Sequence, residues 1–247
     1  MIQYYIINPQ TYDDQFWWKK DDIQFWHNII SLYHSKNFEI LELAAGTGRL
    51  ARPLILSGLN YTGLELSNKY TEYATQKLST NKIIQGDMRS FNLEKKFDMI
   101  FIGFNSFLHL LSYNDIKKCF DCIKRHMTSS TKLYIDIFVP KESFLYRNPN
   151  SFEEVLEFYD NEIKDNVVVK ERLRYIDLQQ VVNVLWKYYD SSGKCIREFK
   201  FKMKIMYPDT FHRLVEDFNL TIQDCWGSYD MEPFNEHSSQ QIYQITL

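Results

Sequence analysis

Residues 40–51 read ILELAAGTGRLA, an apolar run that breaks into a turn containing two glycines. Gly46, Gly48 and Ala51 fit the G-x-G-x-x-G/A spacing of dinucleotide-binding loops that follow a strand. Glu65 lies nineteen residues after Gly46, about where a ribose-binding carboxylate belongs. The stretch predicts a loop that holds an adenosine-containing cofactor, and it leaves NAD, a flavin and S-adenosylmethionine open.

The segments around this loop alternate between strand-like and helix-like patterns. The expected strands are short and mostly apolar, at 38–43, 60–65, 82–85, 97–103 and 132–138. Helices are expected between them, and the clearest begins after Ser67, whose hydroxyl can cap it. This order is typical of a parallel sheet with helices on both faces, so we expect an α/β, Rossmann-like fold.

The pattern changes after Pro140. Three long strand-like stretches follow one another without a helix between them, at 166–175, 179–189 and 195–207. They predict an inserted antiparallel β-sheet. A helix and a β hairpin then close the chain, at 208–218, 220–229 and 241–247.

These patterns divide the chain into four regions. We predict an N-terminal helical lid, a cofactor-binding Rossmann-like core, an inserted antiparallel sheet on the substrate side, and a terminal helix and β hairpin that complete the core, at 1–37, 38–140, 141–207 and 208–247. Within the first region, Phe25 and Ile29 recur at helical spacing and favour packing on the sheet. The stretch near Tyr12 is the part expected to cover the ligand.

Acidic residues stand at the ends of the expected strands, where open parallel sheets bind ligands. Glu65 suits a ribose diol because a carboxylate only accepts hydrogen bonds, and Asp87 suits the exocyclic amine of adenine, beside the apolar Met88. Glu42 would repel a pyrophosphate, whereas S-adenosylmethionine carries an α-ammonium and a sulfonium. The charge of Glu42 therefore favours S-adenosylmethionine over NAD.

Four segments together resemble a known family. LELAAGTGRL, YTGLELS, QGDMRSF and FDMIFIGFNSFLHL are similar to successive segments of class I S-adenosylmethionine-dependent methyltransferases. They resemble more narrowly a bacterial small-molecule branch that includes nucleotide-sugar N-methyltransferases, and the likeness extends to the tail GSYDMEPFNEHSSQQIYQI. Ala44-Ala45 and Glu65 depart mildly from that pattern. The resemblance implies S-adenosyl-L-methionine as cofactor and a closing strand that enters the parallel sheet antiparallel.

The resemblance also implies a set of cofactor-binding residues. Gly46 and Gly48 would contact the methionine part, Glu65 the ribose, and Asp87 and Met88 the adenine. Tyr12 would bond the methionine carboxylate, and Phe104 would lie near the methyl group. The full predicted set is Tyr12, Glu42, Ala44, Gly46, Gly48, Glu65, Leu66, Asp87, Met88 and Phe104.

His109 is the candidate general base, with Tyr12 as the second candidate catalytic residue. Methyl transfer mainly requires an aligned nucleophile, and a hydroxyl acceptor benefits from a base. An ordinary histidine titrates near pH 6.5, which suits that role. The alternative is a histidine that packs or caps a helix start. Of the neighbouring Asn105 and Ser106, Ser106 is expected to cap that helix.

Composition limits the possible partners. The formal net charge of −3 disfavours a nucleic-acid binder. The N-terminal sequence lacks the features of a signal peptide, no stretch is long and apolar enough for a membrane helix, and the four cysteines suit a reducing cytoplasm. We therefore expect a cytoplasmic monomer or homodimer with no metal, no nucleic acid and no membrane partner.

The methyl acceptor stays open. We expect a small molecule, such as a sugar, sugar nucleotide or phosphorylated precursor, methylated on O or N, with O slightly favoured because a base is supplied. Basic residues of the inserted sheet would favour a phosphate if they converge, and otherwise form a solvated face; they are Arg147, Arg172, Arg174 and Lys187. The alternatives are an NAD-dependent oxidoreductase and a catalytically inactive cofactor-binding partner.

Overall fold

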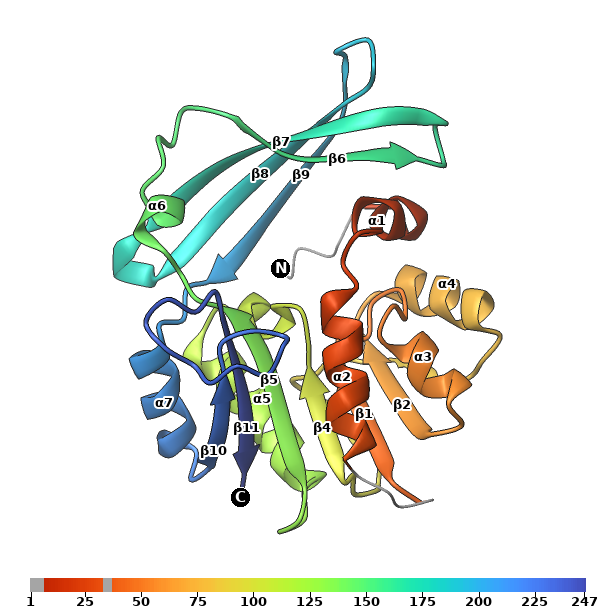
Figure 1. Cartoon of the computed structure of the whole chain (residues 1–247), viewed down its shortest axis with the longest axis vertical. Coiled ribbons are helices and arrows are strands. Elements are labelled where there is room, and N and C mark those ends of the chain that lie inside the picture. The colour runs from red at the N-terminus through yellow and green to blue at the C-terminus, as the bar shows by residue number, and fades with distance from the viewer. Residues whose placement is uncertain (1–6, 33–36) are drawn as a thin grey trace. The chain divides into compact units, whose positions relative to one another are not determined.

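A seven-stranded sheet carries the core of the chain (Figure 1). The computed structural model describes residues 7–32 and 37–247. The strand order is β10-β11-β5-β4-β1-β2-β3. Their bounds are β1 Glu39–Leu43, β2 Asn60–Glu65, β3 Ile83–Gln85, β4 Met99–Ile102, β5 Lys132–Phe138, β10 Thr221–Trp226 and β11 Gln240–Thr246. The first five strands are parallel, and β11 lies antiparallel between β5 and β10. The predicted Rossmann-like fold with an antiparallel closing strand is confirmed.

Helices cover both faces of this sheet. They are α2 Asp21–Ser31, α3 Ala51–Leu56, α4 Asn68–Leu78, α5 Tyr113–Arg125 and α7 Pro208–Asp217. In Figure 1, α2 lies in front of the sheet and α5 behind it. Strand β4 is buried at every residue because both of its faces are covered, which explains its continuous apolar sequence. Trp26 of α2 packs on Phe101 and Tyr134, with ring centroids 4.6 and 6.0 Å away.

The predicted cap of helix α4 is present. The hydroxyl of Ser67 accepts a hydrogen bond from the backbone N–H of Tyr70, which satisfies one of the donors that a helix start leaves without an intrahelical partner. The cap fixes where β2 ends and α4 begins, and Glu65 lies at that point.

Four antiparallel strands form a second sheet, in the order β6-β7-β8-β9. Their bounds are β6 Glu153–Asp160, β7 Asp165–Ile176, β8 Val181–Tyr189 and β9 Cys195–Lys204. The sheet and the short helices α1 Pro9–Gln15 and α6 Glu142–Leu145 belong to a smaller unit, Met1–Lys19 with Pro140–Ile205. The larger unit comprises Lys20–Val139 and Met206–Leu247. The expected antiparallel insertion is confirmed.

Strand β6 was not expected from the sequence. Four of its eight residues are acidic, and acidic residues are uncommon in strands. The strand lies at an edge of the sheet, where exposed charges are tolerated and discourage pairing with other chains. The hydrophobic signal is correspondingly weak, because only Phe158 and Asp160 of this strand are buried.

The structure also divides the N-terminal region that the sequence treats as one helical lid. Helix α1 groups with the smaller sheet, where Asp14 accepts hydrogen bonds from Asn161 N and Nδ2, both at 2.8 Å. Helix α2 groups with the larger unit, and Phe25 and Ile29 are buried there, as their spacing predicts. Residues 1–6 and 33–36 of the predicted lid lie outside the described part of the chain. The role of the N-terminal region as a lid stays a prediction.

Candidate active site

The two glycines of the 44–50 turn have different neighbours. Both have positive φ, at 57° for Gly46 and 75° for Gly48, a conformation that favours glycine. A Cβ on Gly46 would meet no atom within 4 Å. A Cβ on Gly48 would lie 2.7 Å from Leu78 Cδ1 of helix α4 and 3.2 Å from Ile83 Cδ1. Gly46 therefore borders open space that a ligand can enter, whereas the packing of α4 explains Gly48.

Glu65 is tied directly to the glycine turn. Its Oε2 accepts the N–H of Gly46 at 2.9 Å, and its Oε1 accepts the N–H of Ser67 at 2.8 Å. Burial raises the pKa of this carboxyl, and the backbone hydrogen bonds partly oppose that rise. A carboxylate offers about four acceptor positions, so Glu65 keeps capacity for ribose hydroxyls while it braces the turn.

Glu42, whose charge was expected to favour S-adenosylmethionine, is buried in the protein. Its side chain is buried, and its Oε2 accepts the hydroxyl of Tyr61 at 2.5 Å. Gly63 makes room for this pair, because a Cβ there would lie 2.7 Å from the Tyr61 oxygen. Burial raises the pKa of Glu42 to about 8, against the lowering effects of the Tyr61 hydrogen bond and nearby Arg49. Burial therefore disfavours a fixed negative charge on Glu42 at neutral pH.

Asp87 is held in an ion-pair network. Arg89 donates to both carboxylate oxygens of Asp87, with NH2–Oδ2 at 2.6 Å, and its NH1 lies 2.9 Å from Asp115 Oδ1. Burial would raise the pKa of Asp87, but the hydrogen bonds from Arg89 hold it below its ordinary value. Arg89 therefore pairs with two carboxylates, those of Asp87 and Asp115. Asp87 is thus a charged group with a fixed orientation beside Met88.

The turn after β4 contains two successive non-glycine residues with positive φ. Phe104 has φ 50° and Asn105 has φ 64°, and such residues cost on the order of 1 kcal/mol each. Asp136 of β5 accepts the N–H of Phe104 with Oδ2 at 2.9 Å and the N–H of Asn105 with its main-chain oxygen at 3.0 Å. Asn105 Oδ1 in turn accepts the N–H of Phe138 at 2.7 Å. These bonds hold an unfavourable backbone in one shape.

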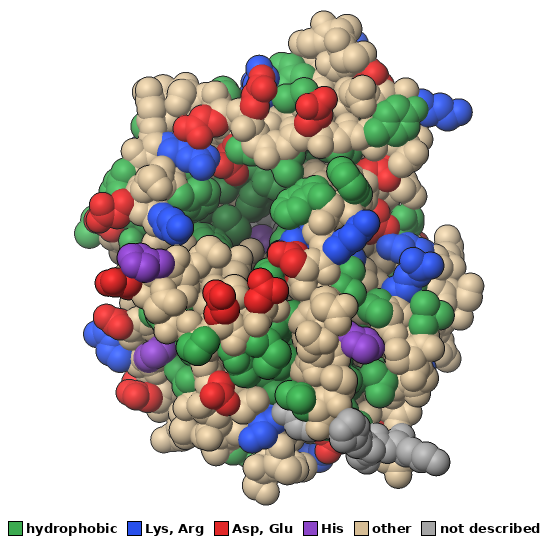
Figure 2. Space-filling view, viewed as in Figure 1, with side chains coloured by type: hydrophobic (Ala, Val, Ile, Leu, Met, Phe, Trp, Pro, Cys, Tyr) green, Lys and Arg blue, Asp and Glu red, His purple; other side chains and the backbone are tan. Residues whose placement is uncertain are grey.

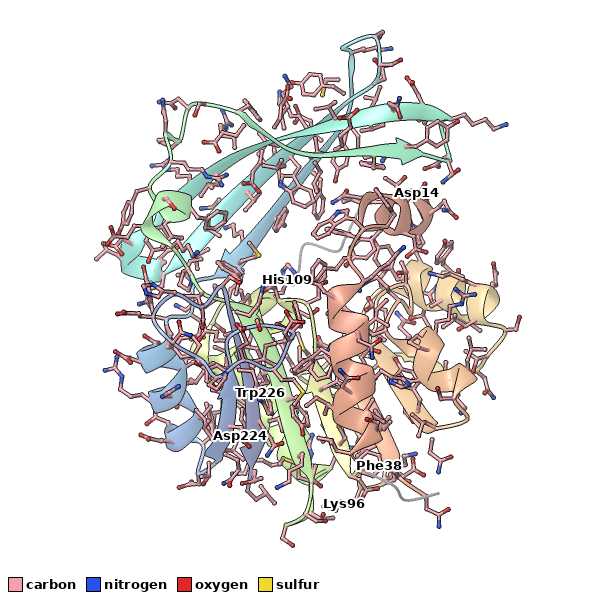
Figure 3. The ribbon with its side chains drawn as sticks, in the orientation of Figure 1. Asp14, Phe38, Lys96, His109, Asp224 and Trp226 are labelled. Atoms are coloured by element: carbon pink, nitrogen blue, oxygen red, sulfur yellow. The ribbon has the colours of Figure 1, made fainter. Side chains whose placement is uncertain are left out.

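His109 ends the 3-10 helix η1, Ser106–His109, that follows this turn. Figure 3 shows it at the carboxyl end of the parallel strands, opposite the end marked by Phe38 and Lys96. The residue at the N-cap is Asn105, and the structure gives it no capping side-chain bond. The expectation that Ser106 caps this helix is therefore wrong, since Ser106 is the first helical residue.

The predicted residues of the larger unit share one environment. They are half-buried and follow the carboxyl ends of β1 to β4: Ala44, Gly46, Leu66, Asp87, Met88, Phe104 and His109. Parallel strands place their carboxyl ends at one edge of the sheet, which is where such sheets bind ligands. The topology therefore gathers most of the predicted set at one edge.

Tyr12 belongs to the smaller unit. It packs against Phe16 at 4.8 Å between ring centroids and joins an apolar cluster that includes Ile7, Phe158 and Tyr188. Its predicted roles toward the cofactor and in catalysis stay predictions.

The four basic residues of the smaller unit do not all meet at one site, and two of them are paired with carboxylates. Arg147 pairs with Glu171 at 3.0 Å, and Lys187 pairs with Glu198 at 2.9 Å. Arg172 and Lys187 both lie over the ring of Phe152, and Arg174 is exposed. On the face that Figure 2 shows, Lys and Arg alternate with Asp and Glu. This arrangement gives the phosphate hypothesis no support.

Two absences hold for residues 7–32 and 37–247. None of the helices described there is long and apolar enough to cross a bilayer. In the same residues, no three His, Cys, Asp or Glu side chains come together as a metal site would require.

The structure adds site contacts that sequence reasoning missed. Arg49 of the glycine turn makes a bidentate pair with the buried Asp22 of α2, at 2.7 and 2.6 Å, and its guanidinium lies 5.1 Å from the ring centre of Phe104. Tyr229 donates to Asp136 Oδ2 at 2.8 Å. The sequence offered one signal for these contacts, the position of Arg49 directly after Gly48. That position does not indicate Asp22 as its partner.

Comparison with known proteins decides which kind of domain this is. Residues 40–130 match a family described as a methyltransferase domain. This part of the chain is a methyltransferase domain. The match spans β1 to the end of α5 and includes the glycine turn, Glu65, Asp87 and His109. The resemblance inferred from the four sequence segments is therefore confirmed.

A curated relative supports the same assignment. The putative methyltransferase YqeM of Bacillus subtilis (strain 168) is 29% identical over 116 residues, which make up 45% of this chain and 47% of the relative. The chain thus spans about half the length of the relative it matches.

Solved structures match the methyltransferase domain and the inserted sheet together. The methyltransferase CcbJ of Streptomyces caelestis has a TM-score of 0.78 at 18% identity, with 97% of this chain and 99% of that chain covered. An S-adenosylmethionine-dependent methyltransferase of Clostridium acetobutylicum scores 0.76 at 18% identity, with 96% of both chains covered. CalS10 of Micromonospora echinaspora, an amino pentose methyltransferase bound to S-adenosylmethionine, scores 0.66 at 15%, with 92% and 91% covered. These likenesses establish the fold.

Proposed function

We propose that this chain is an S-adenosylmethionine-dependent methyltransferase that methylates an O or N nucleophile of a small molecule. One observation carries the proposal: within the methyltransferase domain, the open-sided Gly46 and the carboxylate of Glu65 are joined by a 2.9 Å hydrogen bond. A close-approach backbone and a ribose acceptor thus lie together in the part of the chain that the family match covers.

The larger unit supplies a consistent set of cofactor contacts. Gly46 leaves room for the methionine part, Glu65 accepts from the ribose, and Met88 offers an apolar side chain to the adenine beside Asp87. Arg49 lies over the ring of Phe104 at the same edge, and this ring would face the methyl group. S-adenosylmethionine supplies an activated methyl group when bound, so the protein must mainly align the acceptor and exclude water.

The names of solved structures with the same fold support a proposal for the acceptor class. CalS10 is named as an amino pentose methyltransferase, and KedS8 of Streptoalloteichus sp. as a sugar N-methyltransferase. The inserted sheet of this chain carries clustered aromatic rings, with Trp186 and Phe201 centroids 5.1 Å apart. We propose that this sheet selects the acceptor and that a sugar or another polyfunctional small molecule is methylated.

His109→Ala tests the proposed base. We expect turnover to fall about 100-fold or more, because positioned acid–base groups contribute that much, while affinity for S-adenosylhomocysteine stays within a factor of about two. His27→Ala, a change to an exposed histidine of α2, is the control and should behave as wild type. Unchanged turnover in His109→Ala at every pH would remove His109 as the base.

The proposal itself is tested by a transfer assay. The full chain is incubated with methyl-labelled S-adenosylmethionine and separate sets of amino sugars, sugar nucleotides and hydroxylated small molecules, and the products are identified by mass. We expect a labelled product in at least one set, with the label on O or N. Labelling of tRNA or of protein instead, with no small-molecule product, would contradict the proposed substrate class.

A further inference from the structure

Phe104 is held at two separate points in the larger unit. Its backbone N–H donates to Asp136 Oδ2 at 2.9 Å, and its ring lies under the Arg49 guanidinium at 5.1 Å. Each holding group is itself fixed by a second residue. Tyr229 donates to the same oxygen of Asp136 at 2.8 Å, and Asp22 binds both terminal nitrogens of Arg49.

The four holding residues come from distant parts of the chain. Asp22 lies on α2, Arg49 on the glycine turn, Asp136 on β5 and Tyr229 in the loop after β10. Both carboxylates are almost fully buried, Asp22 at 0% and Asp136 at 1% exposure. Buried carboxylates are costly unless they are paired or hydrogen-bonded, so the bonds of Asp22 to Arg49 and of Asp136 Oδ2 to Phe104 and Tyr229 favour this arrangement.

These contacts constrain the backbone of the turn at Phe104 and Asn105. Phe104 and Asn105 both have positive φ, which side chains with a Cβ rarely adopt, and the bonds to Asp136 hold the turn in that shape. If Asp136 lost its orientation, the turn could relax and the ring of Phe104 would shift away from Arg49.

We propose that Asp136 and Tyr229 are positioning residues that hold Phe104 in the orientation required for cofactor binding. The inference rests on the proposed function, because Phe104 is there taken to face the cofactor. Tyr229 fixes the side chain of Asp136, and Asp136 fixes the backbone of the turn at Phe104 and Asn105. This turn sets the orientation of the Phe104 ring. The terminal loop thereby contributes to the cofactor site through β5.

Tyr229→Phe removes only the hydroxyl that fixes Asp136. We expect the amide of Phe104 to exchange its hydrogen about tenfold faster, and the Kd for S-adenosylhomocysteine to rise about tenfold, as loss of a hydrogen bond to a charged group implies. Tyr134→Phe is the matched control, since its hydroxyl on the same strand as Asp136 donates to Gln244 at 2.7 Å. The control should lose stability to a similar degree and keep wild-type affinity.

A double-mutant cycle distinguishes positioning from a merely structural role. If Tyr229 acts through Phe104, then Phe104→Ala should weaken S-adenosylhomocysteine binding, and adding Tyr229→Phe should change it no further. Additive losses in the double variant, or unchanged affinity in Tyr229→Phe, would overturn the positioning role. Should Tyr229→Phe fold poorly, Asp136→Asn keeps the side-chain size and should give the same non-additivity with Phe104→Ala. Failure of wild type to bind S-adenosylhomocysteine would instead overturn the proposed function, and the positioning role with it.

Discussion

Gly46→Arg should abolish binding of S-adenosylhomocysteine, with a loss of at least about 100-fold in affinity. A side chain on Gly46 would enter the open space beside the turn, where no protein atom lies within 4 Å of a Cβ. An arginine there would occupy the position of the cofactor and place a cation beside its α-ammonium. Isothermal titration calorimetry with S-adenosylhomocysteine measures the loss.

Two other glycines provide the controls for this variant. Gly58 also has positive φ, at 75°, and open space around a Cβ, but it lies in an exposed turn after α3. Gly58→Arg should therefore incur a similar backbone cost and keep full affinity. Gly48→Ala should mainly lower the free energy of unfolding, because its Cβ would clash with Leu78. Full affinity in Gly46→Arg would show that the cofactor does not occupy this space.

Glu42→Gln should change how stability depends on pH. The unfolded carboxyl loses its proton near its ordinary pKa of 4.5, whereas the folded one keeps it up to about 8. Between these values the folded state binds more protons, so the wild-type free energy of unfolding falls as pH rises, by at most about 1.4 kcal/mol per pH unit. Glutamine has no proton to lose, so this contribution disappears.

The comparison is made by denaturant unfolding of both proteins between pH 5 and 9. Relative to wild type, Glu42→Gln should gain stability steadily up to about pH 8 and no more above it, for a total on the order of 4 kcal/mol. Glu39→Gln on the same strand is the control, because Glu39 is partly exposed and pairs with Lys95 at 2.7 Å. Parallel pH profiles for wild type and Glu42→Gln would contradict the buried, protonated state of Glu42.

The carboxyl group of Glu42 also makes the affinity for S-adenosylhomocysteine depend on pH. A nearby α-ammonium favours the ionised form of Glu42, so binding of S-adenosylhomocysteine below pH 8 would release a proton. We therefore expect Glu42 to be largely neutral in the protein alone and to become a carboxylate in the complex.

The parts of the fold that sequence reasoning predicted well are those with local signals. Strands 60–65 and 132–138 were expected with the bounds that the structure gives. The Ser67 cap was found because its signal lies within a few residues. The acidic edge strand β6 and the division between α1 and α2 have weak local signals and were missed.

The candidate site shows the same limit. The glycine turn and Glu65 could be predicted from spacing along the chain, and the structure joins them through the Gly46–Glu65 bond. The hydrogen-bond partners of the site residues could not be predicted, because each pair meets only through the tertiary fold. The pairs are Tyr61 with Glu42, Asp22 with Arg49, and Tyr229 with Asp136. The protonation of Glu42 depends on burial, which a strand-end position alone does not reveal.

The central claim is that the glycine turn holds S-adenosylmethionine and not a dinucleotide. Calorimetric titration of the full chain at pH 7.5 with S-adenosylhomocysteine and, separately, with NAD tests it most directly. We expect a micromolar Kd for S-adenosylhomocysteine, a binding free energy of the order of −8 kcal/mol, and no measurable binding of NAD. Tight binding of NAD without binding of S-adenosylhomocysteine would contradict it.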